Sequence, residues 1–323
     1  MKLATLKDGR FVVVSRDLRL AIEAFDIASS ALEALDRWST VEKALDERYS
    51  ALNERILAQA FRFDPSEAAA PIPKPRQWLD ASAFENHGRL MEKAFNLPPA
   101  DYAVNPMIYQ GNADDFIGPR DDVVAPSEAD NMDFEGELGV VLDDTPMAVP
   151  REKALQHVRL LVLINDVSLR AHAAREMKTG FGWLQAKPST ALAPVAVTPD
   201  ELGDAWADGR CALSIRCERN GEWFGHPNGK LMTFGFDQII AYAAYSRPLR
   251  AGSIIGSGTF SNAEPAAGSA CIAERRAIET IEYGMPNTSF LRSGERVRLE
   301  MLDQEGGSVF GAIDQRYVTI GDS

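Results

Sequence analysis

Two glutamates one residue apart form the most informative pattern in this 323-residue sequence. Glu135 and Glu137 lie within residues 132–142, a stretch whose second half is strongly apolar and predicts a strand. Successive side chains of a strand point to opposite faces, so both carboxylates would project from one face, about 7 Å apart. Two such charges repel each other unless a divalent cation lies between them. The pair therefore indicates either a cation site or a solvated strand face.

A third carboxylate follows a second apolar run. Residues 160–164 read Leu-Leu-Val-Leu-Ile, and the next two residues are Asn165 and Asp166. An aspartate after a buried strand often serves only as a turn or helix-capping residue. If the two strands lie together, however, the three carboxylates form a hard oxygen site that suits Mg²⁺, Mn²⁺ or Ca²⁺. The spacing alone leaves both interpretations open.

The composition narrows the classes of partner. The chain has 34 Lys and Arg against 47 Asp and Glu, and its net charge of −13 repels nucleic acids and anionic membrane surfaces. We therefore expect neither nucleic acid nor a membrane as a partner, and an anionic substrate would need a local cation. No apolar run reaches the roughly 18 residues of a membrane span, and Lys2 and Lys7 argue against a signal peptide. Three cysteines without CxxC spacing favour a reducing compartment, and we expect a cytoplasmic protein.

The elements that must position these residues fall into two parts. Residues 11–14 predict a strand, and residues 18–57 carry apolar side chains at helical spacing. Residues 64–76 contain four prolines, which exclude a helix interior and favour an extended segment. We predict a small N-terminal domain with a proline-rich linker over residues 1–76 and a larger domain over residues 77–323.

The larger domain reads as short strands with few helices. The predicted strands are residues 123–124, 134–142, 160–164, 212–217, 253–255, 271–273, 296–301 and 317–320. The predicted helices are residues 85–94, 151–158, 171–178 and 237–245. Because strands and helices do not alternate regularly, we predict a mixed, β-rich α+β fold. The sequence has no Gly-x-Ser-x-Gly motif and no P-loop, and no third glycine completes a dinucleotide loop after Gly256 and Gly258.

Several motifs beyond residue 77 occur in an order that resembles the C-terminal domain of the fumarylacetoacetate hydrolase superfamily. They are residues 80–87, Tyr109-Gln110-Gly111, residues 133–137, residues 165–170, Lys187-Pro188 and residues 256–259. The resemblance implies the β-rich roll, or β-sandwich, of that family and a bacterial protein similar to fumarylacetoacetase. The N-terminal domain looks helical, whereas the animal enzymes of the family have a small β-barrel there.

The resemblance also implies roles for individual residues. The implied metal ligands, from separate elements, are Asp80, Glu135, Glu137 and Asp166. The implied cofactor is a divalent cation, with Mg²⁺ first and Ca²⁺ or Mn²⁺ as alternatives. His87, seven residues after Asp80, matches the general base, which a glutamate past the glycine-rich motif orients in the family. Glu274 matches that glutamate best, and Glu279 stays an alternative.

Further residues match positions that contact the substrate in the family. Lys187 resembles the lysine that binds and polarises the substrate carbonyl. The implied substrate contacts are Tyr109, Arg170, Gly258 and Thr259. Cys271 has no evident base or cation to activate it, so we expect a buried strand cysteine rather than a nucleophile.

The implied activity is metal-dependent hydrolysis of a carbon–carbon bond in a 1,3-diketone or acylpyruvate, such as fumarylacetoacetate in tyrosine catabolism. By resemblance, the protein would be a homodimer that acts on a small anionic dicarbonyl compound. An oxaloacetate or acylpyruvate decarboxylase, an isomerase or a hydratase would use the same metal-bound enolate, and a non-catalytic scaffold is the alternative from another class. The family's Tyr-His-Gly-Arg segment reads Tyr109-Gln110-Gly111-Asn112 here, so the substrate stays open.

Overall fold

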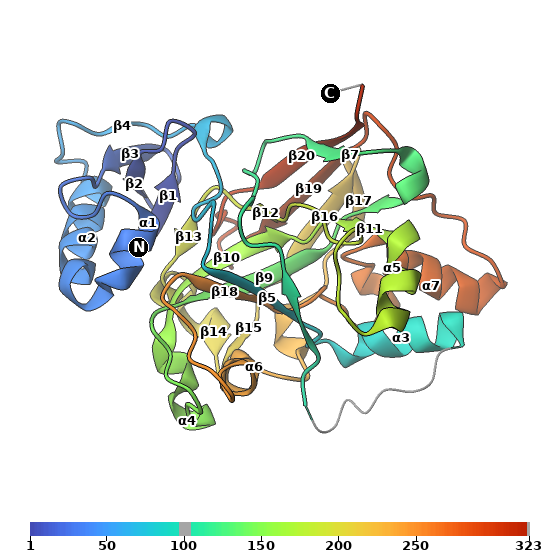
Figure 1. Ribbon diagram of the computed structural model, residues 1–323. Helices are drawn as coiled ribbons and strands as arrows, with labels where there is room; N and C mark the ends of the chain where they lie inside the picture. Colours follow the sequence, from blue (N-terminus) through green and yellow to red (C-terminus); the bar gives the residue numbers. More distant parts are fainter. Residues whose placement is uncertain (97–104, 322–323) are drawn as a thin grey trace.

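The computed structural model describes residues 1–96 and 105–321, and over these residues two main β-sheets form the molecule (Figure 1). In spatial order, the larger sheet contains β4 (Phe61–Arg62), β3 (Leu20–Glu23), β2 (Phe11–Val14), β1 (Lys2–Thr5), β13 (Ala196–Val197), β10 (Val158–Asn165), β9 (Gly136–Leu142), β18 (Ser253–Gly256), β5 (Gln77–Ala81) and β6 (Ile108–Gly111). The short β12 (Ala191–Leu192) pairs with β10 beside this path. The β18–β5 pair is parallel, and the other neighbours in this sheet are antiparallel.

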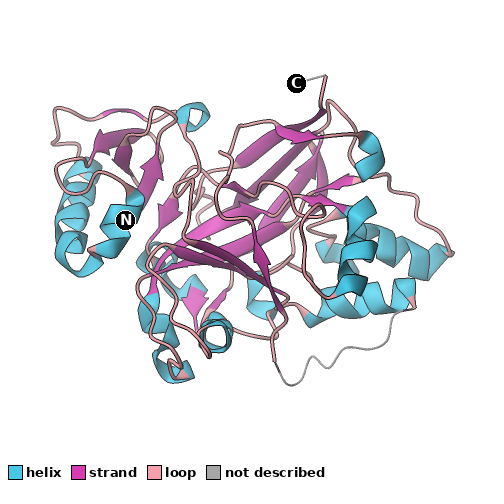
Figure 2. Ribbon diagram, in the orientation of Figure 1, coloured by secondary structure: helices cyan, strands magenta, loops and turns pink. Residues whose placement is uncertain are grey.

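The first four strands and two helices form the N-terminal domain. Helices α1 (Ala31–Asp36) and α2 (Trp38–Asn53) cover its strands (Figures 1 and 2). The buried residues of α2 recur every three or four positions, which places them on one face: Trp38, Val41, Leu45, Tyr49 and Leu52. The helical prediction for residues 18–57 is wrong at its start, because Leu20–Glu23 completes the ladder beside β2 as a strand.

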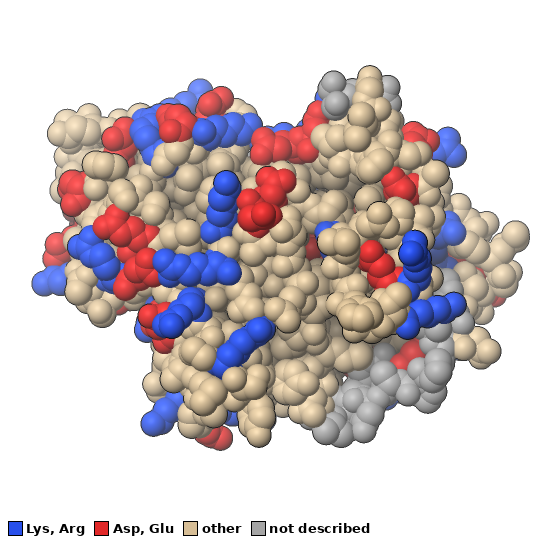
Figure 3. Space-filling view, in the orientation of Figure 1, with Lys and Arg blue, Asp and Glu red and all other residues tan. Residues whose placement is uncertain are grey.

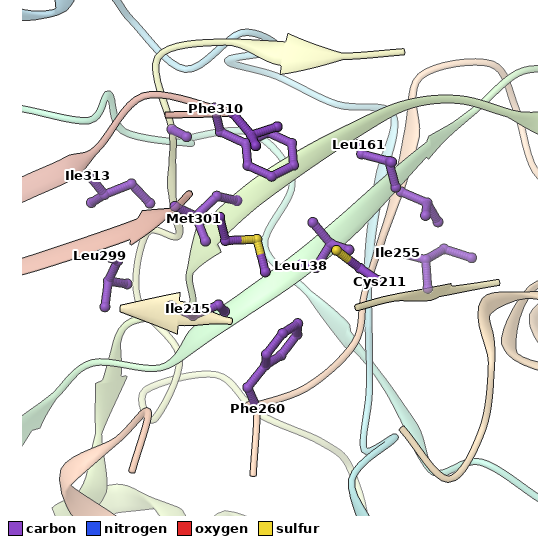
Figure 4. Close-up of a cluster of buried hydrophobic side chains, with 14 of the residues drawn as sticks. Leu138, Leu161, Cys211, Ile215, Ile255, Phe260, Leu299, Met301, Phe310 and Ile313 are labelled. Carbon is purple, nitrogen blue, oxygen red and sulfur yellow. The ribbon is translucent and has the colours of Figure 1, made fainter. Parts of the chain in front are cut away.

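A second sheet packs against the larger one and encloses the main core. In spatial order its strands are β17 (Glu222–Gly225), β16 (Ile215–Arg219), β19 (Arg296–Met301), β20 (Ile313–Thr319) and β7 (Val123–Ala125). Leu138 and Leu161 of the larger sheet and Leu299 and Met301 of β19 are fully buried in one cluster (Figure 4). Two sheets that face each other across such an apolar layer form a β-sandwich.

Three helices gather at one end of the sandwich (Figure 1). They are α3 (Glu85–Phe95), α5 (Arg170–Thr179) and α7 (Ile272–Tyr283). Helix α3 packs against α7, so two segments far apart in the sequence lie side by side. Helices α4 (Arg151–Ala154) and α6 (Phe236–Ala243) pack against each other below the larger sheet in this view.

Short elements connect these layers. The remaining strands are β8 (Met132–Asp133), β11 (Ser168–Leu169), β14 (Trp206–Ala207) and β15 (Arg210–Cys211). The 3₁₀ segments are Pro65–Glu67, Glu128–Asp130, Leu155–His157, Pro199–Ala205, Gly229–Leu231 and Pro265–Ala267. Among the described residues, no helix combines the length and the apolar character needed to cross a membrane.

The mixed, β-rich α+β fold predicted from the sequence is confirmed, while several predicted elements differ from the structure. The strand predicted over residues 212–217 begins only at Ile215. The helix predicted over residues 151–158 is helical only to Ala154, continues as a 3₁₀ segment, and gives way to β10 at Val158. Residues 272–273 begin α7 instead of continuing a strand, because the Asp133 carboxylate accepts hydrogen bonds from the first N–H groups of that helix. Cys271 is buried as expected, but it is the N-cap of α7. The strand predicted over residues 134–142 begins only at Gly136, so Glu135 lies just outside it.

Candidate active site

Three carboxylates from three elements of the larger sheet meet in the interior. Asp80 is the penultimate residue of β5, Glu137 is the second residue of β9, and Asp166 follows β10 directly. The antiparallel pairing of β9 with β10 sets Glu137 opposite Ile164, so the end of β10 lies beside the start of β9. One oxygen of each carboxylate lies within 4.8 Å of the others, and all three residues are buried. We call Asp80, Glu137 and Asp166 the carboxylate cluster.

Two glycines of the motif at residues 256–259 shape this cluster. A Cβ atom at Gly256 would lie 2.4 Å from Asp80 Oδ1 and 3.0 Å from Glu137 Oε2, well inside normal van der Waals contact. Gly258 has a φ of +75° and donates its N–H to Asp80 Oδ1 at 3.0 Å. The backbone therefore approaches the carboxylates more closely than any other residue type would allow.

The cluster is electrostatically unfavourable without a cation. Burial raises the pKa of Asp80 well above its ordinary value, and the Asp166 carboxylate adds to the effect. The pKa of Glu137 is raised in the same way, first by burial and then by Asp80 and Asp166. Among the described residues, neither oxygen of Glu137 has a hydrogen-bond partner. Because buried carboxylates need a compensating partner, these oxygens fit a hard divalent cation.

Glu135, expected as a fourth ligand, lies beside the cluster and has protein cations as partners. One oxygen accepts from Arg170 Nη2 at 2.5 Å and the other from Lys187 Nζ at 2.7 Å. Burial alone would raise the pKa of Glu135, but Lys187, Arg170 and, more weakly, His87 outweigh it and hold the pKa below its ordinary value. The two members of the Glu-x-Glu pair, Glu135 and Glu137, therefore have different environments.

Lys187 connects Glu135 with the cluster. Its ammonium also lies 2.6 Å from Asp166 Oδ2. Burial would lower the pKa of Lys187, but Asp166 and Glu135 outweigh burial and raise it, so the side chain is cationic at neutral pH. Asp166 accepts further hydrogen bonds from the hydroxyls of Tyr109 at 2.5 Å and Thr190 at 2.9 Å. Sequence reasoning missed Thr190, and the available signal was a hydroxyl three residues after Lys187 and directly before β12.

A histidine of helix α3 pairs with a buried glutamate of the neighbouring helix α7. His87 Nδ1 is 2.8 Å from Glu274 Oε2, and Glu274 is fully buried. Because a carboxylate accepts at Nδ1, the hydrogen of the neutral ring stays on Nδ1 and Nε2 is left as an acceptor. The alternative partner, Glu279, instead accepts hydrogen bonds from residues 287 and 288. The structure thus pairs His87 with Glu274.

Only some of the predicted substrate contacts form hydrogen bonds with the carboxylates of the site. Tyr109 and Arg170 bond directly to the carboxylates described above. Tyr109 also packs edge-on against Trp183, with ring centroids 6.2 Å apart. Sequence reasoning missed Trp183, which lies four residues before Lys187. Thr259 is buried and follows Gly258 in the sequence. Among the described residues, its side chain has no hydrogen-bond partner.

A buried oxygen cluster suited to a divalent cation, with a His–Glu pair beside it on a β-sandwich, defines a metal-dependent enzyme. Residues 76–317 match the family described as fumarylacetoacetate (FAA) hydrolase C-terminal, and residues 1–74 match fumarylacetoacetase N-terminal domain 2. The chain therefore belongs to the fumarylacetoacetate hydrolase family. The second match shows that the N-terminal domain also resembles a domain of fumarylacetoacetases. This domain contains both strands and helices.

Curated relatives differ in the activity that they are named for. The chain is 34% identical over 167 residues to 2,4-didehydro-3-deoxy-L-rhamnonate hydrolase of Sphingomonas sp. (strain SKA58), an alignment that covers 51% of this chain and 55% of the relative. It is 31% identical over 224 residues to the mitochondrial oxaloacetate tautomerase fahd2 of Xenopus laevis, covering 68% of this chain and 65% of the relative. The chain thus spans between about half and two thirds of the length of these relatives.

Solved structures with the same fold cover nearly the whole chain. A probable 2-hydroxyhepta-2,4-diene-1,7-dioate isomerase from Mycobacterium abscessus has a TM-score of 0.68 at 20% identity, covering 98% of both chains. Maleylpyruvate hydrolase from Sphingobium sp. SYK-6, solved with manganese(II) and pyruvate, has a TM-score of 0.67 at 17% identity, covering 99% of both chains. At such low identity these likenesses support the fold.

Proposed function

We propose that this protein is a divalent-metal-dependent hydrolase that cleaves a carbon–carbon bond in a small anionic acylpyruvate or related 1,3-dicarbonyl compound. The observation that carries the proposal is the 2.8 Å contact between His87 and the buried Glu274, at a place where His87 helps to lower the pKa of the Glu135 carboxyl. An imidazole held by a carboxylate is suited to remove a proton from water. Water is the reactant that hydrolysis needs and isomerisation does not.

The carboxylate cluster is the proposed binding site of the cation. We favour Mg²⁺, and Mn²⁺ and Ca²⁺ also suit an all-oxygen site. When bound, the cation would polarise the substrate carbonyl and neutralise the enolate charge that develops as the carbon–carbon bond breaks. The support from this chain is Glu137, whose two buried oxygens lack a hydrogen-bond partner among the described residues.

The protein's own groups would move the proton and stabilise charge. His87 Nε2 takes a proton from water, the hydroxide attacks the carbonyl, and the imidazolium returns the proton to the departing carbon. Glu274 stabilises the imidazolium in between. Lys187 and Arg170 also lie at the site, but both already pair with carboxylates. The bound cation would therefore supply the positive charge that attracts an anionic substrate to a chain of net charge −13. Tyr109 and the segment at residues 258–259 are the proposed substrate contacts.

A substrate panel tests the proposal. Fumarylacetoacetate, maleylpyruvate and oxaloacetate are incubated with the protein and Mg²⁺ or Mn²⁺, and the products are separated and quantified. We expect an acylpyruvate or fumarylacetoacetate to give two acids in equal amounts, with no release of carbon dioxide. Turnover that gives a single isomeric product from every compound would contradict hydrolysis. Neither turnover nor metal binding would support a non-catalytic scaffold.

Oxaloacetate tautomerisation is the second candidate, since the Xenopus laevis relative named for this activity matches 68% of the chain. The same His87–Glu274 pair would then move a proton between carbon and oxygen of the substrate, without water as a reactant. The panel distinguishes the two reactions, because tautomerisation changes the enol absorbance of oxaloacetate while no carbon–carbon bond breaks. A rate enhancement for oxaloacetate alone would favour this candidate over the hydrolase.

A further inference from the structure

One buried carboxylate outside the cluster binds four hydrogen-bond donors. Asp133 at the end of β8 is fully buried. Its Oδ1 accepts from the N–H groups of Phe134 at 2.8 Å and Ile272 at 2.7 Å. Its Oδ2 accepts from Ala273 N–H at 2.9 Å and Arg170 Nε at 2.8 Å. Asp133 therefore connects β8 with the starts of two helices, α5 and α7.

The first connection holds the start of α7. The first N–H groups of a helix have no partner within it, and Asp133 accepts from the first two of α7. The N-cap residue, Cys271, offers only its sulfur, a weak acceptor, 3.3 Å from Glu274 N–H. Asp133 thus fixes the backbone immediately before Glu274, and Glu274 holds His87.

The second connection leads to the carboxylate cluster. Arg170 donates from Nε to Asp133 and from Nη2 to Glu135, and its planar guanidinium holds these two acceptors in a fixed relation. Glu135 also accepts from Lys187, whose ammonium reaches Asp166. A continuous set of hydrogen bonds and ion pairs therefore runs from the start of α7 to the cluster.

We propose that Asp133 is a positioning residue that holds the Glu274–His87 pair at a fixed place relative to the carboxylate cluster. Its consequence for turnover rests on the function proposed above. Asp133 acts through Glu274 on one side and Arg170 on the other. A neutral side chain would be enough to cap α7. Only a carboxylate accepts hydrogen bonds at both oxygens and also neutralises the guanidinium.

The variant Asp133→Asn tests this role at nearly constant volume. An amide has one acceptor oxygen, so it can accept from Phe134 and Ile272 or from Ala273 and Arg170, but not from both pairs. We expect kcat to fall about 10- to 100-fold while KM changes less than about threefold, because a misplaced base slows the chemical step. In a His87→Ala background, we expect Asp133→Asn to reduce kcat by less than about twofold further. Losses that multiply in the double variant would overturn the proposal.

Two further variants separate positioning from simple helix capping. Glu279 anchors the other end of α7 to residues 287–288, so Glu279→Gln should reduce thermal stability and leave kcat unchanged. Adding Cys271→Ser to Asp133→Asn supplies an oxygen N-cap to α7. We expect this double variant to regain thermal stability but not kcat. If Asp133→Asn alone does not fold, the kinetic measurements described above are made on the double variant. Recovery of kcat would show that Asp133 is only a helix cap.

A measurement without substrate separates this proposal from the proposed function. In protein labelled with ¹⁵N at histidine, the Nδ1–H of His87 bonded to Glu274 should give a low-field proton resonance, assigned by its absence in His87→Ala. We expect this resonance to be shifted or lost in Asp133→Asn and kept in Glu279→Gln. An unchanged resonance in Asp133→Asn overturns the positioning role, whereas a wild-type protein without turnover contradicts only the proposed function.

Discussion

Glu135 and Glu137 are separated by one residue, but the structure compensates their charges by different means. Glu135 lies before the first residue of β9 and accepts hydrogen bonds from Arg170 and Lys187. Glu137 lies within β9, and its oxygens have no hydrogen-bond partner among the described residues. The protein therefore supplies its own counter-charges to one carboxylate, while the other fits a bound cation.

Changing Glu137 to glutamine tests this difference with little change in volume. Since burial and the neighbouring carboxylates raise the pKa of Glu137, we expect the metal-free variant to gain about 1–2 kcal/mol of unfolding free energy. Its Mn²⁺ affinity should fall at least about 100-fold, because a ligand oxygen loses its charge. Urea unfolding in EDTA and titration calorimetry with Mn²⁺ measure these effects. An affinity equal to that of Glu279→Gln would remove Glu137 from the metal site.

His87 carries the next prediction at this scale. If its Nε2 is the general base, His87→Ala should lower kcat by about 10²- to 10⁴-fold. The Mn²⁺ affinity should change little, because the carboxylate cluster supplies the proposed ligands without His87. Steady-state kinetics on the best substrate of the panel and calorimetry on the same preparation provide the two values. Near wild-type turnover in the variant would exclude His87 from the mechanism.

At the scale of elements, the sequence predicted what apolar runs alone determine. The strands around residues 136–142 and 158–165 follow from continuous buried side chains, and α3 follows from its helical spacing. The start of α7 at residue 272 did not follow, because the group that satisfies its N–H donors, Asp133, is 139 residues away in the chain. Local patterns carry no information about such a distant partner.

The candidate site shows the same division. The ordered motifs predicted Asp80, His87 and Asp166 by resemblance. The structure brings Asp80 and Asp166 together with Glu137, and it pairs His87 with Glu274 close enough to Glu135 to affect the pKa of that carboxyl. Thr190 and Trp183 were missed, because a single hydroxyl or aromatic residue has no spacing that distinguishes it from a core or surface residue. Their roles depend on contacts that only the folded chain defines.

Strands β18 and β5 pack closely at Gly256, and a substitution there tests how much space the site has. In Gly256→Ala the new methyl group would lie 2.4 Å from Asp80 Oδ1 and 2.4 Å from the buried ring of Trp78. We expect the unfolding free energy to fall by about 1–3 kcal/mol, since the core has no space for the group. Mn²⁺ affinity should fall as well, because Asp80 must move.

Gly180→Ala provides the comparison for this variant. Gly180 has nothing within 4 Å of an added Cβ and a φ of +71°, so its replacement reports only backbone strain. We expect Gly180→Ala to destabilise the protein without changing Mn²⁺ affinity in calorimetry. Equal metal binding by Gly256→Ala and the wild-type protein would show that Gly256 does not shape the site.

At the scale of the whole molecule, most charged side chains lie on the surface, but one lysine is buried where the two domains join. Figure 3 shows Lys and Arg interspersed with Asp and Glu on the visible face, so the charges there do not form one large patch of a single sign. Beneath the surface, β1 pairs with β13 and extends the larger sheet into the N-terminal domain. Lys2 of β1 is buried at this junction and donates to the carbonyl of Val309 at 2.6 Å.

Lys2 makes the stability of the whole molecule depend on pH. Burial lowers the pKa of Lys2 from 10.5 to about 8, against the opposing effect of Glu201. Between these two values the unfolded chain holds the proton and the folded chain does not, so this residue makes the unfolding free energy rise with pH. Below about pH 8 both states are protonated, and the contribution is constant. The full change amounts to about 3 kcal/mol.

The variant Lys2→Met lacks this titrating group, so the difference in unfolding free energy between the wild-type protein and the variant should depend on pH. Relative to the variant, the wild-type protein should gain about 2–3 kcal/mol of unfolding free energy between pH 7 and pH 10, measured by urea unfolding at each pH. Lys7→Met, which removes a lysine whose side chain is 43% exposed just after β1, is the control for the loss of a lysine in this part of the chain. A wild-type advantage over Lys2→Met that does not grow above pH 8 would mean that Lys2 keeps its proton in the folded protein, and that the junction admits enough water to solvate it.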